Sequence, residues 1–348
     1  NMSDAQTILN QSLLNAVETN NMPLVEQLLA KGADINAKNW IGQTPLHYAV
    51  VFRYVDLVKF LYEHGADIHA RNDDGETPMH CAVKWGNLDT IKFLYEHGAD
   101  INAKDNTGET PMHCAVKRGN LDTIKFLYEH GADIYARDGK GRAPLHYAGV
   151  ATIPFLYEKG IDIHAQNSGK EAAMHKAAEN GNVGAIKFLY ENGVDINARD
   201  DMGKTPLHDA AEYGRQDAVT FLCDHGANVN AQNRNGSTPL HLSIPGRHIQ
   251  LFETLLEKGA DVTLKDNDGN TVFHRVSSFA GEYKKTDEVE KAIQLLLAKK
   301  ADINAQNNNG QTPLHYAILL TGCSDPSHCC GVELLVKYGA NVNIQDNN

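Results

Sequence analysis

The stretch ETPMHCAVKWGNLDTIKFLYEHGADI, residues 76–101, decides the fold because the chain repeats it almost unchanged at residues 109–134. The two copies differ only at one position, where the first has Trp85 and the second has Arg118. More divergent copies run along the chain, and their Thr-Pro-Leu-His motif or a variant of it begins at residues 44, 77, 110, 143, 172, 205, 238, 271 and 312. Most of these starts are 33 residues apart. A fixed period of this length predicts a stack of similar units rather than one folded core.

Each copy predicts two short helices followed by a turn. Thr is a favoured helix cap, and Pro at the first helical position has no N–H to leave unsatisfied, so the motif begins a helix such as 45–52. In the second half of the copy, Leu88, Ile91 and Leu94 recur at helical spacing and form an apolar stripe. The segment ADINAKDNTG, residues 99–108, is rich in Asn, Asp and Gly and predicts a projecting turn.

These motifs and their period resemble those of the ankyrin-repeat family over nearly the whole chain. The resemblance implies an all-α solenoid of helix-turn-helix units with projecting β-turn fingers. It implies an N-terminal capping repeat at residues 1–37 and nine ankyrin-type repeats at residues 38–348. The fourth full repeat is short near residues 143–160, and inserted residues are expected near 277–292 and 321–331. Because Ala143 and Ala172 replace the capping Thr, we expect a weak joint at residues 143–175.

Composition narrows the functional classes. Hydrophobic residues make up 42% of the chain and charged residues 22%, which is typical of a folded protein. The net charge of −12 repels phosphate backbones, so nucleic acid is not an expected partner. There is no apolar run of the ~18 residues that a membrane span needs, so membrane insertion is not expected. The six cysteines lack the spacing of a disulfide framework, and we expect a cytoplasmic monomer.

No catalytic or cofactor motif of the common kinds occurs, so we expect no enzyme activity, no cofactor and no metal site. The histidine that ends each Thr-Pro motif is expected to bond its own Thr and neighbouring backbone, a role implied by the resemblance. One alternative stays open, because Cys323, His328, Cys329 and Cys330 could form a zinc or redox site.

A second alternative concerns asparagines in the turns. The family includes substrates of asparagine hydroxylases, and Asn36, Asn102, Asn197 and Asn304 have the spacing from Leu and an acidic residue that these enzymes recognise. The other interpretation is that each asparagine holds the turn after its helix.

The resemblance also implies where a partner would bind, namely at the finger tips and the exposed end of each first helix, facing a concave groove. We expect an apolar cluster of Trp40, Ile41, Val51, Phe52 and Trp85. Tyr213 belongs to the same column as Phe52 and Trp85, meaning that all three occupy the same position in their own repeats. We expect a negative rim of Asp73, Asp74 and Glu76, and a basic strip of Lys84, Lys117 and Arg118. Exposed Trp, Tyr and Arg are common interface hot spots. The alternative is that both tryptophans pack on neighbouring helices.

The predicted function is therefore a scaffold that binds a partner protein. The near-identical copies indicate recent duplication, which is typical of arrays that intracellular bacteria deliver into host cells, so a host-directed effector in host cytosol is part of the hypothesis. The alternative is a substrate-targeting arm of a larger enzyme whose catalytic domain lies C-terminal to this segment.

Overall fold

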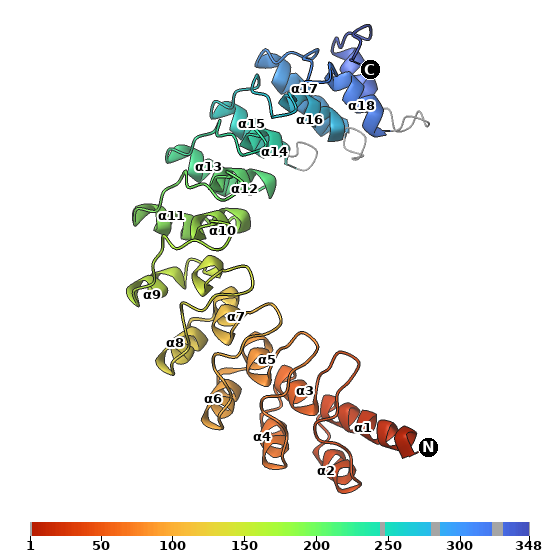
Figure 1. Ribbon diagram of the computed structural model, residues 1–348, viewed down its shortest axis with the longest axis vertical. Coiled ribbons are helices and arrows are strands. Elements are labelled where there is room, and N and C mark those ends of the chain that lie inside the picture. The colour runs from red at the N-terminus through yellow and green to blue at the C-terminus, as the bar shows by residue number, and fades with distance from the viewer. Residues whose placement is uncertain (1, 244–247, 280–285, 322–329, 348) are drawn as a thin grey trace. The chain divides into compact units, whose positions relative to one another are not determined.

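The computed structural model describes residues 2–243, 248–279, 286–321 and 330–347. The described residues form nineteen α-helices and one 3₁₀ helix, with no named strand among them and one isolated β-bridge between Gln166 and Ala172 (Figure 1). The helices follow one another as antiparallel pairs separated by projecting turns. The predicted all-α repeat architecture is confirmed.

The chain divides into two compact units, one ending at Asp162 and the other beginning at Ile163. The elements of the first unit are α1 (Met2–Glu18), α2 (Met22–Ala30), α3 (Pro45–Val51), α4 (Val55–Glu63), α5 (Pro78–Trp85), α6 (Leu88–Glu96), α7 (Pro111–Arg118), α8 (Leu121–Glu129), η1 (Pro144–Tyr147) and α9 (Ile153–Glu158). Those of the second unit are α10 (Ala173–Asn180), α11 (Val183–Glu191), α12 (Pro206–Glu212), α13 (Gln216–Asp224), α14 (Pro239–Leu242), α15 (Ile249–Glu257), α16 (Val272–Phe279), α17 (Thr286–Ala298), α18 (Pro313–Thr321) and α19 (Cys330–Lys337).

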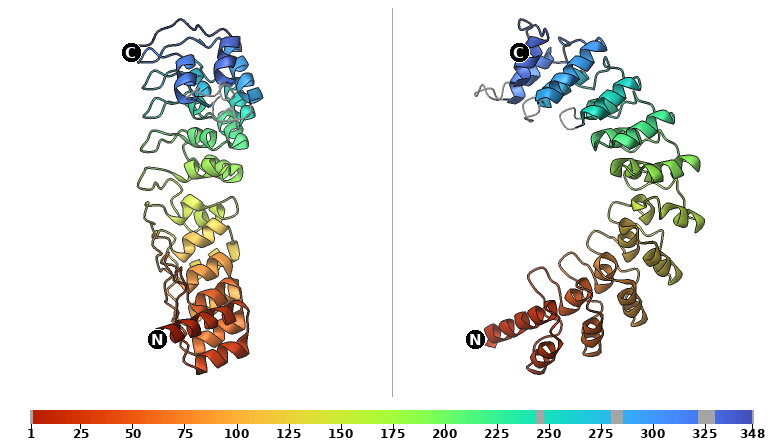
Figure 2. Two further views of the ribbon diagram at one scale, coloured as in Figure 1. Left: turned by 90° about the vertical axis from the view of Figure 1, so that its right-hand side faces the viewer. Right: turned by 180° about the vertical axis from the view of Figure 1, so that it is seen from behind.

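Within each unit, the turns that precede the first helices project to one side of the helix layers as fingers (Figure 2). Within each unit, neighbouring fingers are joined by a backbone hydrogen bond. In the first unit, the N–H of Asp73 donates to the carbonyl of Ile41 at 3.1 Å, that of Asn106 to Asp74 at 2.9 Å, and that of Gly139 to Thr107 at 2.8 Å. These bonds set the spacing of the fingers to that of the repeats.

In seven repeats, a buried histidine joins the first helix to the next repeat. In α5, the ring Nδ1 of His80 accepts from the backbone N–H of Thr77 at 3.2 Å, and its Nε2 lies 3.0 Å from the carbonyl oxygen of Glu109. Because the backbone N–H can only donate, Nδ1 is unprotonated and Nε2 carries the proton that goes to Glu109. The same pair of bonds is made by His47, His113, His175, His208, His241 and His274. The expected structural role of these histidines is confirmed.

The fourth full repeat has shorter helices than its neighbours. Its first helix is the four-residue 3₁₀ helix η1 and its second, α9, has six residues. Ala143 has no hydroxyl, but its backbone N–H still donates to His146 Nδ1 at 3.0 Å. Replacing Thr therefore removes one contact of the motif and keeps the bond to the ring. The boundary between the two units lies in the 143–175 segment, where the weak joint is expected.

The two expected insertions are described only in part. Part of the first insertion lengthens the second helix of its repeat: α17 has thirteen residues, whereas the second helices α13 and α15 of the preceding repeats have nine each. Residues 280–285 of the first insertion and 322–329 of the second lie outside the described residues.

We predict that Gly108→Ala destabilises the first unit more than Gly98→Ala does. Both glycines have positive φ, +79° and +89°, so both substitutions incur the left-handed penalty of about 1–2 kcal/mol. A Cβ at Gly108 would also lie 2.7 Å from the backbone nitrogen of Gly139, whereas one at Gly98 meets nothing within 4 Å. Urea unfolding of the two variants should differ by at least about 1 kcal/mol. Equal losses would contradict a close contact between fingers.

We also predict that the protein loses stability as pH falls below 7. Burial lowers the pKa of the seven paired histidines below 6.5, to about 4 for His208, and the hydrogen bonds and nearby acids offset this only in part. Between the folded and unfolded pKa, the unfolded chain binds more protons, so each histidine costs up to about 1.4 kcal/mol per pH unit of acidification. Urea midpoints measured from pH 7.5 to 5 should fall, and His208→Gln should reduce the slope. Midpoints that stay constant over this range would contradict the buried neutral rings.

Candidate partner-binding surface

Trp40 lies at the tip of the first finger and is 88% exposed. The turn itself is held by Asn39, whose side-chain Oδ1 accepts from the backbone N–H groups of Ile41 at 3.0 Å and Gln43 at 2.9 Å. These bonds use only the backbone of the neighbouring residues. The turn therefore forms without any contribution from the indole ring.

Two more of the expected apolar residues are exposed at the C-terminal ends of first helices. Phe52, which ends α3, is 42% exposed, and its ring lies 6.0 Å from that of Tyr48 and 5.8 Å from that of Tyr54. Trp85, which ends α5, is 51% exposed, while Val51 is half-buried. The exposed aromatic residues thus occupy two places in the repeat, the finger tip and the helix end.

The two near-identical copies differ at one position, and the two residues at this position, Trp85 and Arg118, contact each other. The guanidinium carbon of Arg118 lies 5.4 Å from the centre of the Trp85 ring, within the range of a cation–π interaction. On the other side, Arg53 Nε donates to the carbonyl oxygen of Trp85 at 2.6 Å. Part of the Trp85 ring is therefore used within the array, and about half of its surface is still exposed.

The acidic rim differs from expectation at Glu76. This carboxylate turns back along α5 and forms an ion pair with Lys84, and in the next repeat Glu109 pairs with Lys117 in the same way. Burial lowers the pKa of Lys84, but its hydrogen bond to Glu76 and the nearby acids outweigh burial and raise that pKa to about 12. Of the three residues of the predicted negative rim, Asp73 and Asp74 are exposed, whereas Glu76 is half-buried and paired with Lys84.

The predicted basic strip also contains residues that form ion pairs within the chain. Two of its three cations, Lys84 and Lys117, have an intramolecular carboxylate partner within their own repeats. Among the described residues, Arg118 has no ion pair and its partner is the Trp85 ring.

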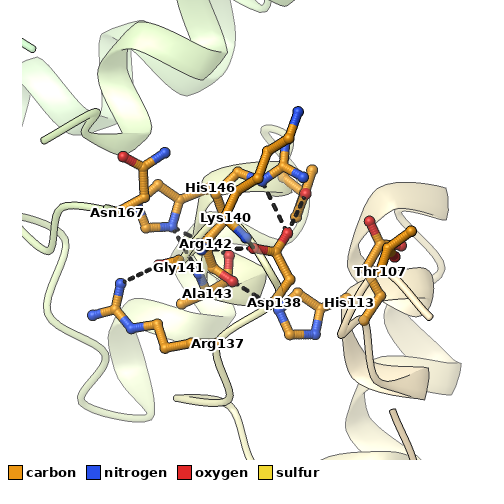
Figure 3. A network of polar contacts seen from close by, with 12 residues as sticks. Thr107, His113, Arg137, Asp138, Lys140, Gly141, Arg142, Ala143, His146 and Asn167 are labelled. Atoms are coloured by element: carbon orange, nitrogen blue, oxygen red, sulfur yellow. Dashed lines mark hydrogen bonds and ion pairs between the residues drawn. The ribbon is translucent and has the colours of Figure 1, made fainter. Parts of the chain in front are cut away.

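A polar cluster in the fourth repeat was missed by the sequence analysis (Figure 3). Asp138 is buried at the base of the finger, where it accepts from Tyr147 Oη at 2.8 Å, Arg142 Nε at 2.9 Å and the backbone N–H groups of Lys140 and Arg142. Burial raises the pKa of this carboxyl, but the hydrogen bonds outweigh it and hold the pKa below its usual value. The charged form is therefore a fixed part of the finger.

The same cluster places two cations over one ring. Lys117 Nζ lies 4.3 Å and Arg142 Cζ 4.8 Å from the centre of Tyr147. The available sequence signal was the Tyr that follows the motif histidine, which Tyr147 shares with Tyr48 and Tyr316. The cations come from a neighbouring helix and from the finger, so the signal did not show them.

In the second unit, Tyr213 ends the first helix α12 and is 49% exposed, as expected from its column. The adjacent Asp209 is buried with Lys204 Nζ at 3.8 Å, and Lys204 also pairs with Glu212 at 2.5 Å. Burial raises the pKa of Asp209 to about 8, and Lys204 only partly offsets this. This second polar cluster was also absent from the sequence analysis.

The turn asparagines link neighbouring repeats. Asn102 Oδ1 accepts from the backbone N–H of Asp133 at 2.8 Å, and its Nδ2 donates to the carbonyl of Gly131 at 3.1 Å. Asn36, Asn197 and Asn304 accept the corresponding bond from the next turn. These contacts agree with the structural interpretation of the four asparagines.

Within the described ranges, no group of three His, Cys, Asp or Glu side chains is arranged to hold a metal ion. The possible zinc or redox loop falls outside that description at Cys323, His328 and Cys329, and the side chain of Cys330 does so as well. Cys81 and Cys114 are buried, and burial raises the pKa of Cys114 to about 12, which disfavours the reactive thiolate. None of the helices described here is both long and apolar enough to cross a bilayer.

Comparison with protein families identifies the class. A model of three ankyrin repeats matches residues 13–105, 149–233 and 174–266, and models of many ankyrin repeats match residues 94–148 and 286–321. A single-repeat model matches residues 309–347. The chain therefore belongs to the ankyrin-repeat family, whose repeats are protein-interaction modules and typically not catalysts. Among curated proteins, none matches the chain.

We predict that Trp85 and Arg118 stabilise each other by about 0.5–1 kcal/mol, the usual value for an exposed cation–π pair. The measurement is a double-mutant cycle in urea with Trp85→Ala and Arg118→Ala. A second cycle with Trp40→Ala and Arg118→Ala serves as the control, because Trp40 lies on the first finger, and its coupling should be near zero. Equal coupling energies in the two cycles would rule out a specific contact.

Proposed function

We propose that this chain is a protein-interaction scaffold that binds its partner through the finger tips and first-helix ends of the first unit, which face a concave groove. The observation that carries the proposal is the exposure of both tryptophans of the chain, 88% for Trp40 and 51% for Trp85. An indole left in water forgoes about 2 kcal/mol or more of burial free energy. Such residues are the ones that interfaces most often use as hot spots.

The remaining members of the proposed surface surround these anchors. Phe52 adds apolar area at the helix ends, and Asp73 and Asp74 add negative charge on the second finger. The repeat provides rigidity, because the backbone bonds between fingers hold them in register before any partner arrives. A preorganised surface loses little conformational entropy on binding.

The near-identity of residues 76–101 and 109–134 also supports a proposal about the cell compartment in which the scaffold works. Recently duplicated arrays of this kind are delivered into host cells by intracellular bacteria. By analogy, the chain would act on a host protein in the host cytosol.

The test is affinity capture from eukaryotic cytosol with the wild-type chain and the Trp40→Ala/Trp85→Ala variant. Each captured protein is then purified and titrated against both. Loss of two hot spots should weaken binding at least about 30-fold, equivalent to about 2 kcal/mol. The control is Ile8→Ala, which removes an apolar side chain that is 68% exposed on α1, and its affinity should stay within about twofold of wild type. Equal weakening by both variants, or no weakening by the tryptophan pair, would refute the proposed surface.

A further inference from the structure

The position that differs between the duplicated repeats lies at a surface pocket. This pocket, of about 320 Å³, lies between α5 and α7 and is lined by Lys84, Trp85, Glu109, Cys114, Lys117 and Arg118. Trp85 supplies an apolar wall that is still half exposed, and Arg118 stands against that wall. The single difference between the two near-identical segments therefore places an aromatic ring and a guanidinium together at one opening.

The charges around the pocket are arranged asymmetrically. The acids are turned inward: the side chains of Glu76 and Glu109 are only 14% and 9% exposed, and each is paired with a lysine of its own repeat. Arg118, by contrast, is exposed and has no carboxylate partner among the described residues. The pocket thus offers positive charge on a chain whose net charge is −12.

A second arginine extends the positive charge along the helix ends. Arg53 is exposed, and its Nε is held by the carbonyl oxygen of Trp85 at 2.6 Å. Arg53 thus contacts the backbone of Trp85, and Arg118 contacts its ring. Each guanidinium has donors left over after its observed contact, because arginine has five N–H groups in a planar fork.

We propose that this pocket binds an acidic segment of a partner protein, with an Asp or Glu carboxylate on Arg118 and an adjacent apolar side chain on Trp85. The proposal rests on the proposed function and specifies the chemistry of the partner. Charge complementarity selects the segment, because an acidic chain is repelled by most of this protein and attracted where the acids are already neutralised. A bidentate bond between Arg118 and a carboxylate then provides direction as well as attraction.

The test begins with a display library of random twelve-residue peptides, selected on the full chain. Selected peptides are synthesised and titrated against the Trp40→Phe variant, in which Trp85 is the sole tryptophan and can be excited selectively at about 295 nm. We expect peptides that shift the Trp85 emission to be enriched in Asp and Glu next to apolar residues. Their affinity should fall as salt is added.

Two charge reversals separate the pocket from the overall charge of the chain. Arg118→Glu should weaken the peptides at least tenfold, whereas Lys125→Glu, which makes the same change on the outer helix α8, should leave affinity within about twofold. Trp85→Arg, which makes residues 76–101 and 109–134 identical in sequence, should also weaken binding, as measured by titration calorimetry because the Trp85 emission is lost.

Several results would overturn the proposal. These are failure to select any peptide that shifts Trp85, selection of neutral or basic peptides, or equal effects of the two charge reversals. Binding of phosphatidylserine vesicles at Trp85 in place of peptides would also overturn it. Neutral peptides whose affinity depends on Trp85 would contradict the acidic segment but agree with the proposed interaction surface. A partner whose affinity does not change when both tryptophans are replaced would refute that surface as well.

Discussion

The hydrogen bond from a buried imidazole to the backbone of the next repeat is the interaction on which the rest of the structure depends. Helices of seven to nine residues are too short to be stable alone, so each pair needs its neighbour. Apolar packing supplies most of the free energy but tolerates sliding of one layer on the next. The Nε2–H bond of His80 to Glu109 does not tolerate sliding, because it has a length and a direction. The register of the helices, and with it the register of the fingers, follows from this bond.

The same constraint separates residues that serve the fold from residues that serve a partner. The motif Thr and the finger Gly make their hydrogen bonds within their own repeat, whereas the motif His and the turn Asn also bond to the next repeat. Trp40, Phe52 and Trp85 contribute surface that no such bond requires. In a repeated structure, a side chain that departs from its column without a structural reason is where a specific function can be placed. The pairing of Trp85 with Arg118 shows that such a departure can still contact its neighbours.

The ion pairs of the charged residues do not follow from their positions in the repeat. Glu76 and Lys84 are eight residues apart and belong to different parts of the repeat, yet the fold brings them together. Asp138 is likewise enclosed by Arg142 and Tyr147 once the finger closes onto η1. In both cases the partner is chosen by how a long side chain extends, which the sequence pattern does not specify. Three members of the predicted rim and strip, Glu76, Lys84 and Lys117, therefore have an internal partner that the sequence pattern did not show.

The sequence by itself determined the repeat and the helix starts at Thr-Pro, because these depend on residues whose spacing recurs, mostly every 33 residues. Its resemblance to the ankyrin-repeat family implied the all-α solenoid and the structural role of the histidines. It also identified the columns that hold Trp40, Phe52 and Trp85, which the structure describes as exposed. Only the tertiary structure decided which charges are neutralised internally, that Tyr147 lies beneath two cations, and that Trp85 and Arg118 meet at a pocket. The physical reason is that these contacts join neighbouring repeats or opposite ends of one repeat, and their geometry exists only after the layers have stacked.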